Sequence, residues 1–97
     1  VLKDEKTAEP TRAARAIDPD SGRVMEVWTT EPGIQLYTAN NMGGRHGAGG
    51  VTYEKHAGFC LEAQHLPNSP NRPDYPSPVL RPEQTYRQIT VHKFSVE

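Results

Sequence analysis

The sequence has one cysteine, Cys60, so no disulfide bond can form within the chain. Disulfides are characteristic of secreted proteins, and a lone cysteine fits the reducing interior of a cell. Residues 1–10 also lack the apolar stretch of a secretory signal, because charged side chains interrupt them: Lys3, Asp4, Glu5, Lys6 and Glu9. We therefore expect a cytoplasmic protein.

Long apolar runs and an excess of one charge are missing as well. A membrane-spanning helix needs about 18 or more consecutive apolar residues, and no segment of the sequence approaches that length. Eleven lysines and arginines stand against twelve aspartates and glutamates, which gives a formal net charge of -1. Because a basic surface is absent, we expect neither a nucleic-acid partner nor a membrane partner.

Apolar residues are also few, at 34% of the 97 residues. Proline and glycine are frequent, with nine prolines and eight glycines. A chain of this length buries a small fraction of its surface, so its core must be thin. The composition leaves two interpretations open: a marginal domain that folds alone, or a fragment whose apolar face is completed by residues outside this chain. We favour the fragment.

Alternation of apolar and polar residues predicts five β-strands, at residues 13–17, 24–30, 34–39, 59–66 and 86–96. The turn residues 31–33 join the second and third of these, which predicts an antiparallel hairpin. The fourth strand carries apolar and polar residues on both faces, so we expect it to be central and covered on two sides.

The connecting segments contain no helical periodicity, so the chain is expected to be all-β. Residues 1–12 are a charged lead-in, and residues 13–97 form part of a single domain. The glycine-rich residues 40–50 predict an irregular loop, and the six prolines of residues 67–82 predict an extended surface excursion.

Most residues of chemical interest have an ordinary explanation. Residues 44–49 resemble a phosphate-binding loop only loosely, since no helix follows them. The histidines lack the short spacings that place two ligands on one metal ion, so we expect surface or packing roles and no metal site: His46, His56, His65 and His92. Cys60 is expected to be a small buried hydrophobic residue rather than a nucleophile.

Glu62 is harder to explain, because it lies within an apolar stretch of the fourth predicted strand. A shielded glutamate needs a stabilising partner. It could pair with an arginine such as Arg81 or Arg87, or face water from an edge strand. Partial desolvation would also suit a general base that works near neutral pH. The residues alone do not decide between these alternatives.

Three segments in order resemble the aldose 1-epimerase (galactose mutarotase) family: SGRVMEV with TEPGIQLYT at residues 21–27 and 30–38, GFCLEAQHLPNSPN at 58–71, and LRP at 80–82. The resemblance implies a large antiparallel β-sandwich of which this chain is the carboxy-terminal part. It also implies interconversion of the α and β anomers of free aldohexoses such as galactose or glucose, without metal or organic cofactor.

The resemblance assigns roles to two residues. Glu62 matches the family glutamate that takes the proton from the C1 hydroxyl, and Gln35 matches the glutamine that hydrogen-bonds sugar hydroxyls. The family's acid histidine would precede residue 1, in the remainder of the same enzyme, so we expect the isolated chain to be inactive. Departures from the family pattern bear on the rim of the sugar cleft and hence on which aldose is preferred: Ala39, Ala63, Glu83 and a shorter loop at 41–53.

Two rival interpretations remain at this stage. A related sandwich could bind carbohydrate without catalysis, and it would then have no need of paired upstream histidines. The chain could also be a structural or assembly piece whose other portion is a separate chain. A cooperative thermal melt of the lone chain would indicate an independent domain, whereas aggregation would indicate a missing partner.

Overall fold

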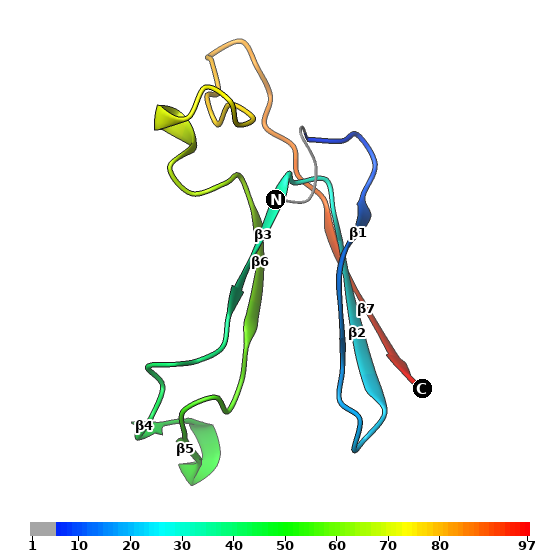
Figure 1. The fold of residues 1–97 in the computed structure, drawn as a ribbon, viewed down its shortest axis with the longest axis vertical. Helices are drawn as coiled ribbons and strands as arrows, with labels where there is room; N and C mark the ends of the chain where they lie inside the picture. Colours follow the sequence, from blue (N-terminus) through cyan, green and yellow to red (C-terminus); the bar gives the residue numbers. More distant parts are fainter. Residues whose placement is uncertain (1–5) are drawn as a thin grey trace.

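The computed structural model of the chain describes residues 6–97 (Figure 1), so the predicted lead-in at 1–12 lies partly outside the described residues. The described part contains strands and two single 3₁₀ turns and no α-helix, which confirms the all-β prediction. Neither 3₁₀ turn is long and apolar enough to cross a membrane. The elements are β1 Thr11–Ile17, β2 Arg23–Thr29, β3 Gly33–Tyr37, β4 Arg45–His46, η1 Ala48–Gly50, β5 Thr52–Tyr53, β6 Cys60–Gln64, η2 Ser69–Asn71 and β7 Thr90–Val96.

The larger sheet has the antiparallel order β1-β2-β7, with β2 in the centre. The turn at residues 18–22 brings β1 back against β2, whereas β7 arrives from the other end of the sequence. Val24 and Val27 of the central strand are buried, and they are two of the few hydrophobic residues that the described chain fully covers. The prediction of a thin core is therefore confirmed.

The predicted hairpin of the second and third strands is wrong, because β2 and β3 belong to different sheets. Both edges of β2 are already occupied, one by β1 and the other by β7. Just after β2, the Thr30 backbone N–H donates to the Ile89 carbonyl at 3.0 Å. The connection at residues 30–32 therefore carries the chain into a second sheet, where β3 pairs antiparallel with β6.

The expectation that residues 59–66 form a central strand covered on two sides is also wrong. In the described part of the chain β6 has β3 as its one neighbour, and no further layer covers its faces. Cys60 is consequently exposed rather than buried, and 51% of the Phe59 surface is accessible. This sheet of two strands therefore has exposed side chains on both strands, although others remain half-buried.

The connecting segments follow the sequence prediction in part. Within the glycine-rich region, β4 and β5 form a short antiparallel pair, so the predicted irregular loop contains a small hairpin. The proline-rich residues 67–82 follow the prediction in part: they contain no strand or α-helix, but turns at 67–68 and 73–75 flank η2, and only residues 76–81 run without a turn. The last strand begins at Thr90, later than the pattern suggested, and the preceding residues cross over to reach the larger sheet.

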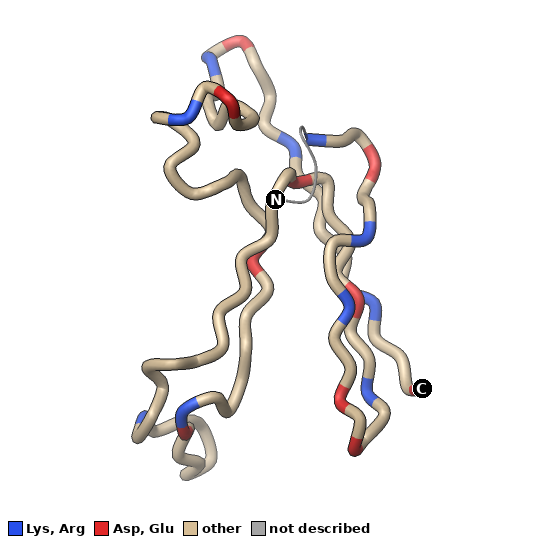
Figure 2. Tube along the Cα trace, viewed as in Figure 1, with Lys and Arg blue, Asp and Glu red and all other residues tan. Residues whose placement is uncertain are grey.

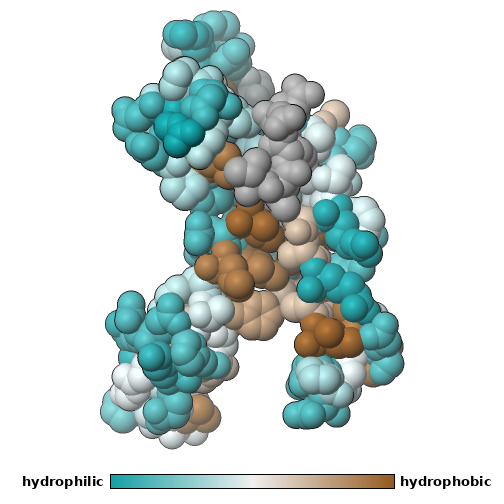
Figure 3. All heavy atoms as spheres, viewed as in Figure 1, coloured by the Kyte–Doolittle hydropathy of each residue, from teal (hydrophilic) through white to brown (hydrophobic). Residues whose placement is uncertain are grey.

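The two sheets meet at one end and separate toward the other, which gives the chain an open, two-armed shape (Figure 1). The junction lies at the end of β2, where Thr29, Thr30, Glu31 and Pro32 are all buried. Hydrophobic side chains gather between the arms (Figure 3). The interior of this piece is thus mainly polar at the junction, with apolar surface left open beside it.

Gly22, in the turn between β1 and β2, is expected to tolerate no side chain. Its φ of +72° lies in the left-handed region, and an added Cβ would come within 2.6 Å of the Glu97 carbonyl oxygen. Gly22→Ala in the full-length protein should lower the free energy of unfolding by about 1–2 kcal/mol from the backbone alone, and by more from the contact. Chemical denaturation measures the change.

Substitutions at two further glycines separate the two contributions to the expected loss of stability: the left-handed backbone and the close contact of the added Cβ. Gly44 also has a positive φ, of +77°, but open space surrounds it, so Gly44→Ala should show the smaller, conformational loss alone. Gly58 has neither a positive φ nor a close neighbour, and Gly58→Ala should leave stability unchanged. Equal losses for Gly22→Ala and Gly58→Ala would contradict the explanation.

Candidate functional site

The two residues selected from the sequence lie directly opposite each other in the smaller sheet. Gln35 is the middle residue of β3, Glu62 is the middle residue of β6, and the antiparallel register pairs the two. Residues opposite each other in an antiparallel pair point to the same face, with Cβ atoms about 4.5–5.5 Å apart. One face of this sheet therefore presents a carboxylate and an amide side by side.

Both side chains are exposed and have little to hold them. The Gln35 amide nitrogen donates to the Leu36 carbonyl at 3.3 Å, which leaves its oxygen and a second N–H available. Among residues 6–97, the Glu62 carboxylate makes no ion pair, so neither Arg81 nor Arg87 is its partner. The expected shielding of Glu62 is wrong for the described chain, because only β3 lies beside β6 and nothing covers this face.

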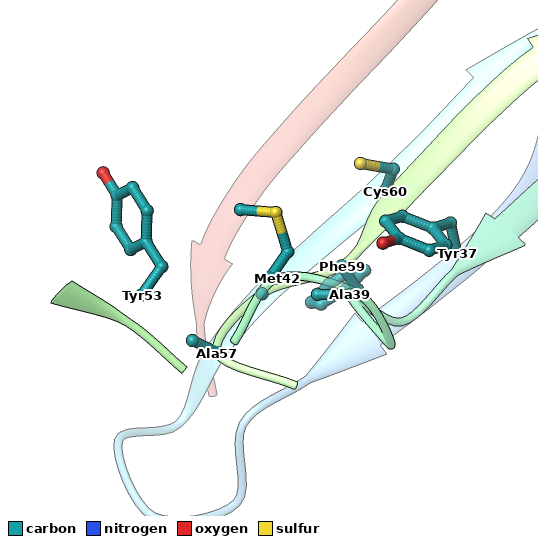
Figure 4. A pocket seen from close by; sticks show the side chains of 8 residues that line it. Tyr37, Ala39, Met42, Tyr53, Ala57, Phe59 and Cys60 are labelled. Carbon is teal, nitrogen blue, oxygen red and sulfur yellow. The ribbon is translucent and has the colours of Figure 1, made fainter. Parts of the chain in front are cut away.

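The same face continues into an apolar pocket. Two residues beyond the candidate pair along each strand, Tyr37 of β3 lies opposite Cys60 of β6, and both line a pocket of about 230 Å³ (Figure 4). Met42, Tyr53 and Phe59 complete much of its lining. The alternation of residues along β3 places Tyr37 on the same side as Gln35, and this spacing is the sequence signal for the pocket end of the face.

Two hydrogen bonds hold the loop that follows β3 against this pocket. The backbone N–H of Asn41 donates to the Tyr37 hydroxyl at 3.4 Å. The His56 ring nitrogen Nδ1 lies 2.6 Å from the Thr38 carbonyl oxygen. The first bond ties the Tyr37 hydroxyl to the loop, at the boundary between the polar pair and the apolar pocket.

None of the four histidines shares the face that carries Glu62. His46 lies in β4, His56 in the loop before β6, and His92 in β7, where its ring stacks on Phe94. His65 follows β6 and contacts Glu31. Within residues 6–97, no three side chains of His, Cys, Asp or Glu approach closely enough to hold a metal ion.

The arrangement offers a proton acceptor beside a group that both donates and accepts hydrogen bonds. An exposed carboxylate can accept a proton, and a neighbouring amide can donate to and accept from hydroxyl groups. No histidine of the described chain is placed to return a proton on this face. Within the described residues, the face therefore presents one proton-accepting carboxylate and one amide, and no histidine beside them.

Comparisons with known proteins identify the family of the chain. The family model described as "Aldose 1-epimerase" matches residues 2–93. The chain is 46% identical to mouse galactose mutarotase over 96 residues, 49% identical to human galactose mutarotase over 84 residues and 37% identical to the aldose 1-epimerase of Escherichia coli K12 over 87 residues. These matches cover 98%, 86% and 88% of the chain but 28%, 25% and 25% of the relatives. The chain thus spans about a quarter of their length, and it belongs to the aldose 1-epimerase family.

Proposed function

We propose that the full-length protein carrying this chain is an aldose 1-epimerase, which interconverts the α and β anomers of free aldohexoses such as galactose or glucose. In this proposal Glu62 is the general base and Gln35 binds sugar hydroxyls. The observation that carries the proposal is their pairing in register on one open face of the β3–β6 sheet. Membership of the family supports the same reaction.

The proposed reaction needs proton transfers only. The Glu62 carboxylate takes the proton from the C1 hydroxyl, the C1–O5 bond breaks, and an acid from the remainder of the protein protonates O5. Rotation about the C1–C2 bond exposes the other face of the aldehyde, and ring closure with the protons returned gives the other anomer. Neither electrons nor groups are exchanged with a cofactor, so we propose that none is required.

The exposed state of Glu62 fits this proposal if other parts of the protein cover the face. The curated relatives are about four times as long as the part of them that this chain matches. Residues outside the chain would close the sugar site above Gln35 and Glu62 and supply the acid. Covering the face would also desolvate the carboxylate and make it a stronger base.

Polarimetry of freshly dissolved α-D-galactose tests the proposal. The full-length protein should bring the optical rotation to equilibrium much faster than buffer, whereas the isolated chain should leave the buffer rate unchanged, because an acid is missing from it. If the full-length protein binds galactose but does not accelerate anomerisation, it is a carbohydrate-binding module and the proposed activity is wrong.

A further inference from the structure

Glu31 is a buried carboxylate outside the candidate site. It is 1% exposed and is the largest fully buried side chain of the described residues. A buried charge is costly unless charged or hydrogen-bonding groups surround it. Three side chains do so: Lys6 Nζ lies 3.2 Å from Oε1, His65 Nδ1 lies 3.0 Å from Oε2, and the Tyr86 hydroxyl donates to Oε1 at 3.4 Å.

These contacts tie both sheets to a single side chain. Glu31 precedes β3 and His65 directly follows β6, so the contact lies at the end of the smaller sheet where β3 begins and β6 ends. Lys6 precedes β1 and Tyr86 precedes β7, which belong to the larger sheet. Acidic and basic residues lie close together where the two sheets join (Figure 2). Away from this junction the sheets separate (Figure 1).

The candidate base lies a short distance along the same strands. Glu62 is three residues before His65, and Gln35 is four residues after Glu31, which is about 10–13 Å at the rise of a β-strand. Because Glu62 has no ion pair of its own among the described residues, the backbone of the smaller sheet sets its position. Whatever fixes the junction end of that sheet also fixes the direction in which Glu62 points.

We propose that Glu31 and His65 are positioning residues for Glu62, and that their pairing is strongest when the imidazole of His65 is protonated. This inference rests on the proposed function, since it concerns the placement of the proposed base. The Oε2 atom of Glu31 is buried and accepts no hydrogen bond within residues 6–97, and His65 Nδ1, at 3.0 Å, is the one basic group of the described residues within ion-pair distance of it. A protonated imidazole at that distance pairs with the oxygen by charge, and this pairing is stronger than the contact of a neutral ring.

The other charged groups around His65 do not replace it. Lys6 pairs with Oε1, the opposite oxygen, and 29% of its side chain is exposed, so water screens its repulsion of the imidazolium. Arg87 lines the same cavity as His65, Lys6 and Tyr86 but makes no ion pair in the described chain. Burial raises the pKa of Tyr86, and the nearby Glu31 carboxylate raises it further, so the hydroxyl stays protonated and remains a donor.

The test compares wild type, His65→Gln and His65→Lys in the full-length protein between pH 5.5 and 8.5. Glutamine can donate one neutral hydrogen bond, as neutral histidine can, whereas lysine stays charged across the range. At pH 5.5 wild type should exceed His65→Gln in kcat for α-D-galactose by about fivefold, and at pH 8.5 the two should agree. His65→Lys should keep the advantage over His65→Gln at both pH values, with KM unchanged.

The results decide between the proposal and its alternatives. If the ratio of kcat between wild type and His65→Gln is the same at every pH, His65 acts as ordinary packing and the positioning proposal is overturned. The melting midpoints must follow the same pattern, with a difference at pH 5.5 that disappears at pH 8.5. If Glu62→Gln stays fully active, the proposed base is wrong, and the positioning of Glu62 is overturned with it. Loss of activity in Glu62→Gln with a flat His65 ratio overturns the positioning alone.

Discussion

Glu62→Gln in the full-length protein should lower kcat for α-D-galactose by about 10²–10⁴-fold, the usual cost of removing a general base. The amide keeps the size of the side chain and its capacity for hydrogen bonding, but it cannot accept the C1 proton. Because Glu62 is exposed and has no ion pair within residues 6–97, the substitution breaks no structural contact of the chain. Polarimetry at saturating sugar measures kcat, and KM should change little.

Glu9→Gln provides the matched control for this loss. Glu9 is also an exposed glutamate, but it precedes β1, which belongs to the larger sheet. The control removes the same charge by the same change and should retain wild-type kcat. If Glu62→Gln instead stayed within about threefold of wild type, the assignment of the base would be wrong.

The sequence located the candidate pair but not its geometry. Alternation along β3 tells which residues of that strand share a face with Gln35, and alternation along β6 does the same for Glu62. It does not tell which strands pair or in what register, because a shift by one residue would place the two side chains on opposite faces. The direct opposition of Gln35 and Glu62 came from the structure.

The wrong hairpin shows the limit of local signals. A proline and a glycine between two alternating segments are typical of a turn, and residues 31–33 contain both. The competing partner of β2 was β7, whose Thr90 lies opposite Thr29 although 61 residues separate them. A pairing over that separation has no local sequence signature, so the nearer strand was the natural but incorrect choice.

Glu31 was missed for a related reason. The sequence placed it in a turn, where a charged residue is ordinarily exposed, and its burial depends on four segments that meet only in the folded chain. Glu62 showed the opposite error, since apolar neighbours in the sequence suggested shielding that the described chain does not provide. Burial depends on how the sheets pack together. Neither the turn residues around Glu31 nor the apolar neighbours of Glu62 carry that information.

Gln35→Leu in the full-length protein should lower kcat/KM for α-D-galactose by about 5–100-fold, because leucine leaves sugar hydroxyls unpaired at a covered site. Gln35 makes one long hydrogen bond, to the carbonyl of its neighbour, so the folded chain loses little when the amide is removed. The loss should therefore appear in kinetics and not in the melting midpoint. A fall in both would indicate a structural role instead.

Gln35→Glu gives a sharper test of the shared face. It places a second carboxylate directly opposite Glu62 in the antiparallel register, and two like charges at that distance oppose each other's ionisation. The acidic limb of the kcat/KM profile should then move to higher pH, because more base is needed to deprotonate the pair. Leu36→Glu, on the opposite face of the same strand, is the control and should not move that limb. An unshifted limb in Gln35→Glu would mean either that the two side chains do not lie side by side in the full-length protein or that Glu62 is not the base.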